Sequence, residues 1–352
     1  IQTETLTNKS TKLVGKFIGK VNVGESTIMR VRYDDATLAK LREEILQGKL
    51  SVHDRLGIIR DMFALAEGGY INTVTALDFS LVYRNETEYI VWAEIASGID
   101  KVNHIIAEEP FKDLYHKYAR QIFSPLAEKM GYDKKKNEDG SHTFLRNLAL
   151  SHAALYGNEQ IKKQAKKMFA ELNKNPIPAD IRSVIYGIVA RGGGVKEWTT
   201  FEKMYKSTTL DEEKDRIGRA LSGFKDKTLL ARTLTYALSK NVRAQDAPFI
   251  IGSAWQNTHG RDLAWKFVKY NWDVILKRYG EGGHFLGRII AALGGHIKAE
   301  DVLDAKKFFK ENNAPGAKRT LEQAYEKIHS NALWLKADKA SIKNWLEKNY
   351  KK

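Results

Sequence analysis

The side chains that could bind a metal ion or act as a nucleophile are few in this sequence and widely separated. The chain has no cysteine and nine histidines. The histidines lie at positions 53, 104, 116, 142, 152, 259, 284, 296 and 329, so no two of them are three to five residues apart. Zinc ligands on one helix or hairpin need that close spacing, and without cysteine there is no thiolate ligand, thiol nucleophile or disulfide. We therefore expect no metal-ligating and no catalytic residue in this chain.

Other motifs of catalytic sites are also missing. The sequence contains no His-Glu-x-x-His, no Gly-x-Ser-x-Gly elbow and no phosphate-binding loop. Its glycine-rich runs, 192–194 and 280–283, follow helical stretches and therefore indicate helix ends. Acidic pairs such as Glu43–Glu44 and Glu212–Glu213 lie in segments rich in Lys and Arg, which is typical of solvated helix faces.

The net charge of the 352-residue chain is +15, from 58 Lys and Arg against 43 Asp and Glu. A basic chain can bind nucleic acid or another polyanion. Here the basic residues alternate with acids, as in 159–167, and no RNA-binding motif, zinc finger or arginine-rich arm occurs. We therefore do not expect nucleic acid as the partner.

No stretch of the sequence approaches the ~20 apolar residues that a transmembrane helix requires, and no signal peptide is apparent. Together with the lack of cysteine, this favours a cytoplasmic protein that does not bind membranes. The first residue is Ile1 rather than methionine. The sequence is therefore predicted to be a fragment or a clipped product of a longer protein.

The elements that position these side chains fall into two groups, of which residues 1–33 form the first. Residues 12–22 and 28–33 alternate apolar and polar side chains near a period of two, and the segment 23–26 between them has turn composition. This pattern predicts a short β-hairpin. Because a lone hairpin is marginally stable in water, we expect it to pack against helices or to belong to a sheet completed by further chain.

From residue 34 to residue 352 the pattern is helical. Apolar residues recur at spacings of three and four, as between Leu56 and Ala66, and short polar or glycine-rich loops separate successive stretches. Tandem helices of this kind predict a mostly α fold. We expect a HEAT- or armadillo-like superhelical array of antiparallel helix pairs, which would curve into a bowl.

Residues at the helix starts have the spacing of capping boxes. Ser51 with Asp54, and Asn85 with Glu88, are predicted to cap two helices. Gly98 is expected to end the second of these helices, because glycine is common just beyond a helix C-terminus.

Three of the most specific segments are Asn85-Glu-Thr-Glu-Tyr-Ile-Val-Trp92, Val242-Arg-Ala-Gln-Asp246 and Ala264-Trp-Lys-Phe-Val-Lys-Tyr-Asn-Trp272. Further such segments lie at 54–66, 122–126, 178–182, 213–216 and 331–335. In order along residues 20–350, these segments resemble the C-terminal helical domain of zinc aminopeptidases of the puromycin-sensitive and aminopeptidase N type. The resemblance covers nearly the whole chain.

The resemblance implies a domain arrangement. In that family a catalytic domain carries His-Glu-x-x-His and Gly-x-Met-Glu-Asn, a β-sandwich follows in many members, and a helical bowl comes last. Both motifs are absent here, so the family's catalytic residues have no positions to map onto. Residues 1–33 would be the end of the small β-sandwich domain, and residues 34–352 the helical repeat domain. The parent enzyme would hold zinc and release N-terminal amino acids, whereas this chain would be inactive alone.

The function that the resemblance implies is that of a non-catalytic, regulatory domain. It would enclose the substrate cavity, bind the distal part of peptide substrates and take part in open/closed domain motion. Its partners would be the N-terminal catalytic domain of the same protein and the peptides themselves.

Because a peptide ends in a carboxylate, which Arg holds through paired charge-assisted hydrogen bonds, basic and polar residues at helix starts or within apolar runs are candidate peptide-binding residues. They are Tyr186, Arg243, Gln245, Asp246, Arg261 and Arg288. Helix-cap contacts or hydrogen bonds between helices are the competing interpretation of these side chains.

Two other interpretations stay open at this stage. A free-standing helical-repeat scaffold that binds a protein or a nucleic acid would also fit the helical pattern and the charge of +15. Alternatively, the chain is one part of a split or clipped enzyme, and its catalytic part is a separate polypeptide.

Overall fold

The computed structural model describes residues 19–280, 284–314 and 316–351, and every regular element in these ranges is helical. The mostly α fold predicted from the sequence is therefore confirmed. The α-helices are α1 (Asp35–Leu46), α2 (Val52–Glu67), α3 (Thr73–Ser80), α4 (Tyr89–Ile105), α5 (Lys112–Met130), α6 (Gly140–Leu155), α7 (Glu159–Ala170), α8 (Arg182–Arg191), α9 (Val195–Ser207), α10 (Asp211–Leu221), α11 (Lys227–Leu238), α12 (Ala247–Gln256), α13 (Arg261–Tyr270), α14 (Trp272–Tyr279), α15 (His284–Ala291), α16 (Ala299–Glu311) and α17 (Lys318–Tyr350). Short 3₁₀ helices η1 (Val23–Glu25), η2 (Leu81–Asn85), η3 (Ala179–Ile181) and η4 (Ala292–Gly295) connect some of them.

Polar side chains fix where many of these helices begin. Ser51, Asn158 and Asp226 each accept a hydrogen bond from the backbone N–H three residues later, at the starts of α2, α7 and α11. Such caps satisfy backbone donors that have no partner within the helix, and each stabilises its helix by about 1 kcal/mol. The loops between helices are short, and many consecutive helices pack against each other, as α5 does on α6 and α7 on α8.

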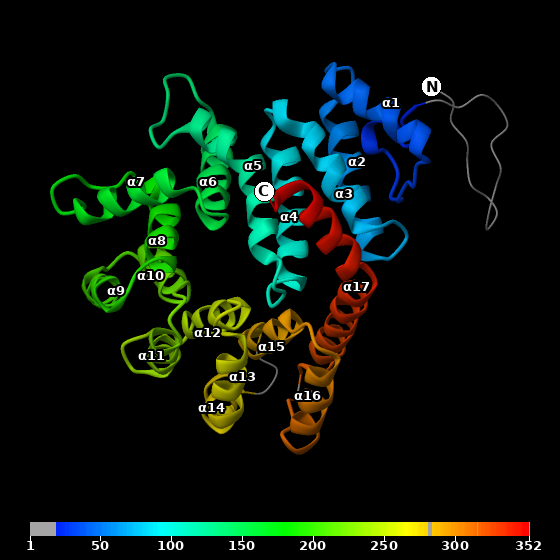
Figure 1. Cartoon of the computed structure of the whole chain (residues 1–352). Helices are drawn as coiled ribbons and strands as arrows, with labels where there is room; N and C mark the ends of the chain where they lie inside the picture. The colour runs from blue at the N-terminus through cyan, green and yellow to red at the C-terminus, as the bar shows by residue number, and fades with distance from the viewer. Residues whose placement is uncertain (1–18, 281–283, 315, 352) are drawn as a thin grey trace.

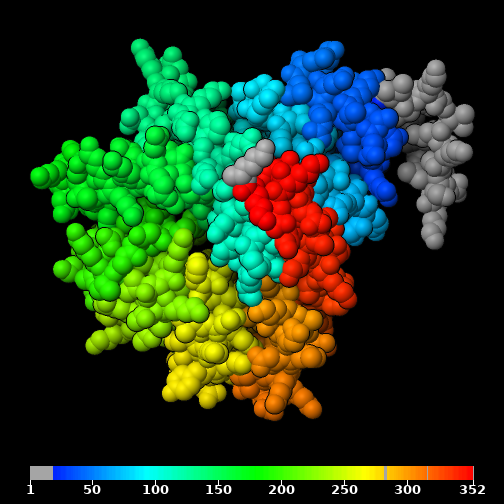
Figure 2. Space-filling view, in the orientation of Figure 1, coloured from blue at the N-terminus to red at the C-terminus, as the bar shows by residue number. Residues whose placement is uncertain are grey.

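The helices follow one another around an arc (Figure 1). From α1 the chain passes through α4 and α5, turns through α7 to α11, and continues through α12 to α16. The long helix α17 then runs back from the α15–α16 end of the arc to α3, α4 and α5. In the space-filling view the red C-terminal segment joins the orange segment to the cyan one (Figure 2). The two ends of the arc are thereby connected.

A polar cluster fastens α17 to the start of α3. The buried carboxylate of Asp338 accepts hydrogen bonds from the Thr73 backbone N–H (2.8 Å), the Thr73 hydroxyl (2.5 Å) and the Asn72 amide (3.1 Å). The Trp334 indole N–H also donates to the Thr73 hydroxyl, at 2.7 Å. A carboxylate at a helix N-terminus is favourable because it meets free N–H groups and the positive end of the helix dipole. This cluster therefore holds the arc closed.

Residues 19–33 lie against α2 and contain no strand. The Val31 backbone N–H donates to Asp61 Oδ2 at 3.0 Å, and Arg30 forms an ion pair with the same carboxylate. The Gly24 N–H donates to Asp54 Oδ1 at 2.8 Å. The prediction of a strand at 28–33 was therefore wrong, because Asp61 of α2 binds the Val31 N–H that a neighbouring strand would need. Most of the other predicted strand, 12–22, lies outside the described residues.

Two helix boundaries also differ from the predictions. Gly98 does not end a helix but lies inside α4, where its missing side chain leaves room for the Phe63 ring of α2. The apolar pattern of residues 261–278 predicts one amphipathic helix, but the structure divides it at Asn271 into α13 and α14. The difference at Gly98 arises from packing between two helices, which the periodicity of one segment does not contain.

Candidate functional site

The candidate site is a basin on the inner side of the arc, at the level of α4. Three adjoining cavities all include Asp100 and His104, on neighbouring turns of α4, in their walls. The opposite walls come from α8, α10, α12 and η4, and from α17. The arc and its closure by α17 thus bring helix ends that are far apart in the sequence around one depression.

The lobe of the basin between α5, α8 and α12, here called the α8–α12 lobe, has a volume of about 500 Å³. Four cationic side chains line it, together with the carboxylates of Asp100 and Asp113. The cations are Lys112, Arg191, Arg219 and Lys225. Arg219 binds Asp215 at 3.0 Å, whereas the other three cations make no ion pair or side-chain hydrogen bond within the described part of the chain.

Arg191 is the last residue of α8 and precedes Gly192, where the helix ends. A cation at a helix C-terminus is favoured by the helix dipole, so α8 tolerates this charge at its end. Burial lowers the pKa of Arg191, while Asp100 and Tyr156 act in the opposite direction. Because a guanidinium has so high an intrinsic pKa, it stays charged. The result is a partly desolvated positive group that faces the basin without a direct partner.

The positive potential of this lobe contributes to lowered pKa values of the neighbouring titratable groups. Burial lowers the pKa of Lys225, and Arg191 and Lys112 lower it further, although the side chain remains accessible to the water of the basin. The pKa of His259 is lowered by burial and then by Lys225 and Lys112. His116 shows the same direction, with burial as the main cause. An anion in this lobe would relieve the repulsion among these groups.

Asp100 is held in place from behind. It accepts hydrogen bonds from the Tyr156 hydroxyl at 2.6 Å and from His152 Nε2 at 3.0 Å, while His152 Nδ1 lies 2.7 Å from the Leu148 carbonyl oxygen. Both imidazole nitrogens therefore face acceptors, which favours the doubly protonated ring. Burial opposes the charge of His152, but the hydrogen bond and charge of Asp100 outweigh it, so the pKa of His152 is raised.

The second lobe lies against α17 and has a volume of about 720 Å³. Lys327 of α17 lies in its wall and binds Glu67 at 2.5 Å, and Lys101 binds the same carboxylate at 2.8 Å. The pKa of His104 is lowered to about 4, chiefly by burial and then by the charge of Arg261. His104 is therefore neutral near pH 7. Of the two cations in this wall, Lys327 is thus already paired, and Arg191, which this lobe shares with the α8–α12 lobe, is not.

Three of the candidate residues form hydrogen-bond networks between helices. The Tyr186 hydroxyl donates to Glu213 Oε1 at 2.6 Å, and joins α8 to α10. Arg243 donates to both carboxylate oxygens of Asp246, at 2.7 and 2.9 Å, and Tyr205 of α9 donates to the same group. Tyr186, Arg243 and Asp246 therefore connect neighbouring helices, as the competing interpretation from the sequence expected.

The remaining candidates lie at separate places. Gln245 is exposed, and Arg288 is exposed on α15, 4.7 Å from the centre of the Phe249 ring. Arg261 is only 3% exposed. It lies behind His104, to which its Nη2 approaches at 3.4 Å, and its Nε has no hydrogen-bond partner among the described residues. The structure therefore does not bring the six candidates together.

The predicted helix caps have different outcomes. Asp54 and Ser51 exchange hydrogen bonds at the start of α2, with the Asp54 N–H donating to Ser51 Oγ at 3.2 Å. Asn85 and Glu88, in contrast, make no capping hydrogen bond to α4. Glu86 lies there instead and accepts hydrogen bonds from the backbone N–H groups of residues 87 and 88, at 2.8 and 2.9 Å. Arg55 pairs with this carboxylate, so the anion needed at the helix start comes from the residue beside the predicted one.

The basin residues that sequence reasoning missed are Lys112, Arg191 and Lys225. Each stands at a helix end or in a turn between helices, where a basic residue is unremarkable. The polar loop 256–260 was the only local signal, and residues 256–259 do line the α8–α12 lobe. Nothing in the sequence tells which helix ends point to the inside of the arc.

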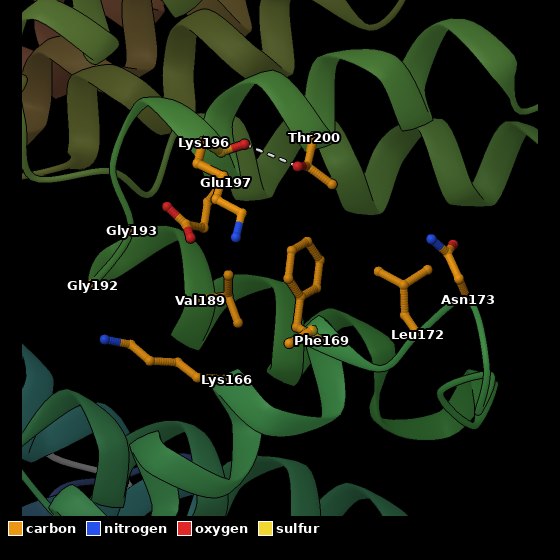
Figure 3. A pocket seen from close by; sticks show the side chains of 11 residues that line it. Lys166, Phe169, Leu172, Asn173, Val189, Gly192, Gly193, Lys196, Glu197 and Thr200 are labelled. Atoms are coloured by element: carbon orange, nitrogen blue, oxygen red, sulfur yellow. Dashed lines mark hydrogen bonds between the residues drawn. The ribbon is translucent and has the colours of Figure 1, made fainter.

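A second pocket, of about 470 Å³, lies between α7, α8 and α9 (Figure 3). Apolar side chains gather in it, from Phe169, Leu172 and Val189. The Thr200 hydroxyl at its edge donates to the Lys196 carbonyl oxygen at 2.9 Å. Two lysines in its lining, Lys166 and Lys196, also have no ion pair among the described residues. Because apolar side chains form its centre, the basin with its three unpaired cations is the better candidate for recognising a charged ligand.

No group of three or more His, Asp or Glu side chains within the described ranges is arranged to hold a metal ion. The part of the chain that the structure describes therefore does not fit a zinc site. None of the described helices combines the length and hydrophobicity needed to cross a membrane.

Comparison with known proteins shows that the chain is similar to a family of C-terminal domains and to several aminopeptidases. Residues 19–330 match the family model of the ERAP1-like C-terminal domain. The chain is 29% identical to aminopeptidase 2, mitochondrial, of Saccharomyces cerevisiae over 348 residues, 97% of this chain and 36% of the relative. It is 30% identical over 334 residues to aminopeptidase M1 of Arabidopsis thaliana, covering 91% of this chain and 37% of that protein. With aminopeptidase N of Canis lupus familiaris it shares 28% identity over 345 residues, 94% of this chain and 35% of the relative. The chain thus spans little more than a third of the curated relatives it matches.

Proposed function

Because the chain belongs to the ERAP1-like C-terminal domain family, we propose that it is the non-catalytic C-terminal domain of a zinc-dependent aminopeptidase. In this proposal the bowl encloses the cavity in which the enzyme holds its substrate, and the basin binds the distal part of the peptide. The catalytic activity, the zinc ion and the catalytic domain that faces the bowl belong to the part of the protein outside this sequence. The names of the relatives, all aminopeptidases, support this assignment.

The observation that carries the peptide-binding role is the set of unpaired cations inside the basin. Arg191, Lys112 and Lys225 face one cavity and have no ion pair among the described residues. A peptide held by its N-terminus in a catalytic domain ends in a carboxylate, and Arg binds carboxylates through charge-assisted hydrogen bonds. Such bonds are worth about 1.5–3 kcal/mol. The distal end of a peptide is therefore the anion that this basin suits.

Two further parts of the proposal concern organisation and motion. The division into residues 1–33, as the end of a preceding β-sandwich domain, and residues 34–352, as the helical domain, stays a prediction. A cavity closed on all sides admits a peptide only if the domains separate, so the bowl is expected to move between open and closed positions. Small-angle scattering of the full-length enzyme should show a smaller radius of gyration when peptide is bound, and an unchanged radius would contradict the motion.

Peptide binding is tested by fluorescence anisotropy with the 352-residue chain. A labelled peptide with a free C-terminal carboxylate should bind at least about tenfold more tightly than the same peptide ending in an amide, from the value of one charge-assisted bond. Arg191→Gln should remove this difference, whereas Lys163→Gln, which changes an exposed lysine on α7, should preserve it. Equal affinity of both peptides for the unaltered chain would contradict the proposal.

The chain alone should not hydrolyse aminoacyl substrates. Turnover of a fluorogenic aminoacyl amide, together with a stoichiometric bound metal, would show that a catalytic site exists in this chain. Binding of mixed-sequence RNA with a steep dependence on salt would instead favour the scaffold interpretation. Under the proposal, neither is observed.

A further inference from the structure

The cations of the α8–α12 lobe exceed what one peptide carboxylate can neutralise. Arg191, Lys112 and Lys225 are without partners within the described ranges. Of the two carboxylates in the same wall, Asp100 is already bound by Tyr156 and His152, and only that of Asp113 remains to offset the three cations. A single terminal carboxylate brings one negative charge to this site. At least one more cation would then remain unpaired in a partly desolvated cavity, which is unfavourable.

The position of Lys112 also favours a ligand with more than one negative charge. It is the first residue of α5, where the positive end of the helix dipole disfavours a cation. It also lowers the pKa of Lys225 and His259, which are in the opposite wall. The charge of Lys112 is therefore unfavourable for the free domain, and a bound anion would make it favourable.

The same lobe has room and neutral hydrogen-bonding groups for a second anionic group. Its volume of about 500 Å³ lies within the range of roughly 300–1,000 Å³ that is typical of ligand pockets. Ser253, Gln256 and Thr258 line it, and their side chains have no hydrogen-bond partner among the described residues. They can orient a ligand without adding charge.

From these observations we infer that the α8–α12 lobe selects peptides that carry an acidic side chain next to their C-terminal carboxylate. Arg191 and Lys225 bind the two carboxylates, and Lys112 supplies the charge that balances the second. This inference rests on the proposed peptide-binding function and adds the class of peptide to it. The ligand is a dianionic peptide end, and Lys112 and Lys225 are the residues that determine specificity.

The test uses four labelled peptides of the same length that differ only at the end. They terminate in Glu-Ala or Gln-Ala, each with a free carboxylate or a C-terminal amide. With the 352-residue chain, the Glu peptide should bind about tenfold more tightly than the Gln peptide when both end in a carboxylate, the effect of one charge-assisted bond. In the variant with Lys112→Gln and Lys225→Gln this ratio should fall to about twofold or less. Lys163→Gln, on the outside of α7, should leave it unchanged.

The outcomes distinguish a failure of the inference alone from a failure of the proposed function. If the carboxylate peptides bind better than the amides but Glu and Gln are equal, the inference is overturned and the proposed function stands. If no peptide binds, both are overturned. If the preference for Glu persists in the double variant, its melting temperature being unchanged, the acidic side chain is recognised elsewhere and the assignment to this lobe is wrong. A stability gain from Lys112→Gln, measured by thermal unfolding, is expected alongside the loss of preference, and a stability loss would contradict the argument from the helix dipole.

Discussion

The closure of the arc by α17 depends on the buried carboxylate of Asp338, and replacing Asp338 with alanine should open it. The carboxylate accepts hydrogen bonds from the Thr73 N–H and hydroxyl, at 2.8 and 2.5 Å, and from the Asn72 amide at 3.1 Å. A hydrogen bond to a charged group is worth about 1.5–3 kcal/mol when it cannot be replaced. Two effects offset part of this loss: water enters the vacated space and binds the freed donors, and alanine favours the helix by up to about 0.7 kcal/mol. We therefore expect the free energy of unfolding to fall by about 3 kcal/mol in total.

The loss is measured by urea unfolding followed by circular dichroism. Glu322→Ala, at an exposed position of the same helix, gives the control for the propensity change and should alter the free energy by less than about 0.5 kcal/mol. The loss of stability for Asp338→Asn should lie between the losses for these two variants, because the Asn side chain keeps one acceptor oxygen but turns its amide donor towards Thr73. In Asp338→Ala, the rate of backbone amide hydrogen exchange should rise in α3 and in the C-terminal half of α17 but not in α9. A loss below about 1 kcal/mol for Asp338→Ala, or exchange that does not change in α3, would refute the role of this cluster in closing the arc.

Three more predictions concern the side chains around the basin and in the core. The charge of His152, whose pKa is raised, stabilises the fold fully below the ordinary imidazole pKa, and this stabilisation is lost as the pH rises through the higher folded-state value. The stability difference between the unaltered chain and His152→Gln should therefore shrink as the pH is raised above the ordinary imidazole pKa of about 6.5, and a difference that grows with pH would contradict the paired imidazolium. Tyr186→Phe removes the hydroxyl that binds Glu213 at 2.6 Å and should cost about 1–2 kcal/mol of stability. The peptide dissociation constant should stay unchanged, and a marked loss of affinity would show that Tyr186 takes part in peptide binding. Gly98→Ala places a Cβ in steric overlap with the Phe63 ring, so thermal unfolding should show a loss of about 2–3 kcal/mol, and a neutral effect would mean that α2 and α4 separate easily.

The helices themselves could be predicted because their signals are local. The caps Ser51, Asn158 and Asp226 lie within three residues of the N–H groups that they bind, so spacing along the sequence is enough to find them. Gly98 is a position at which local sequence signals are not enough. Its place in the middle of α4 is explained by the Phe63 ring of another helix, and glycine at that position otherwise predicts a helix end.

The site could not be predicted in the same way. Its cations are on α5, at the end of α8 and after α10, and they meet only because the arc brings these helix ends together. A lone basic residue in a sequence gives no sign of whether a carboxylate will pair with it. Arg243 illustrates the converse, since its guanidinium is occupied by Asp246, and only the structure distinguishes it from Arg191, which has no such partner.

The central claim, that the basin receives the distal end of a peptide, is tested most directly by photo-crosslinking. A peptide with benzoylphenylalanine beside a free C-terminal carboxylate is bound to the 352-residue chain, irradiated and mapped by mass spectrometry. We predict crosslinks to the wall of the α8–α12 lobe, in 100–104 of α4 and in 253–259 at and beyond the end of α12, which an excess of unlabelled carboxylate peptide abolishes. Crosslinks confined to the pocket between α7 and α9, or scattered over the outer surface, would contradict the claim.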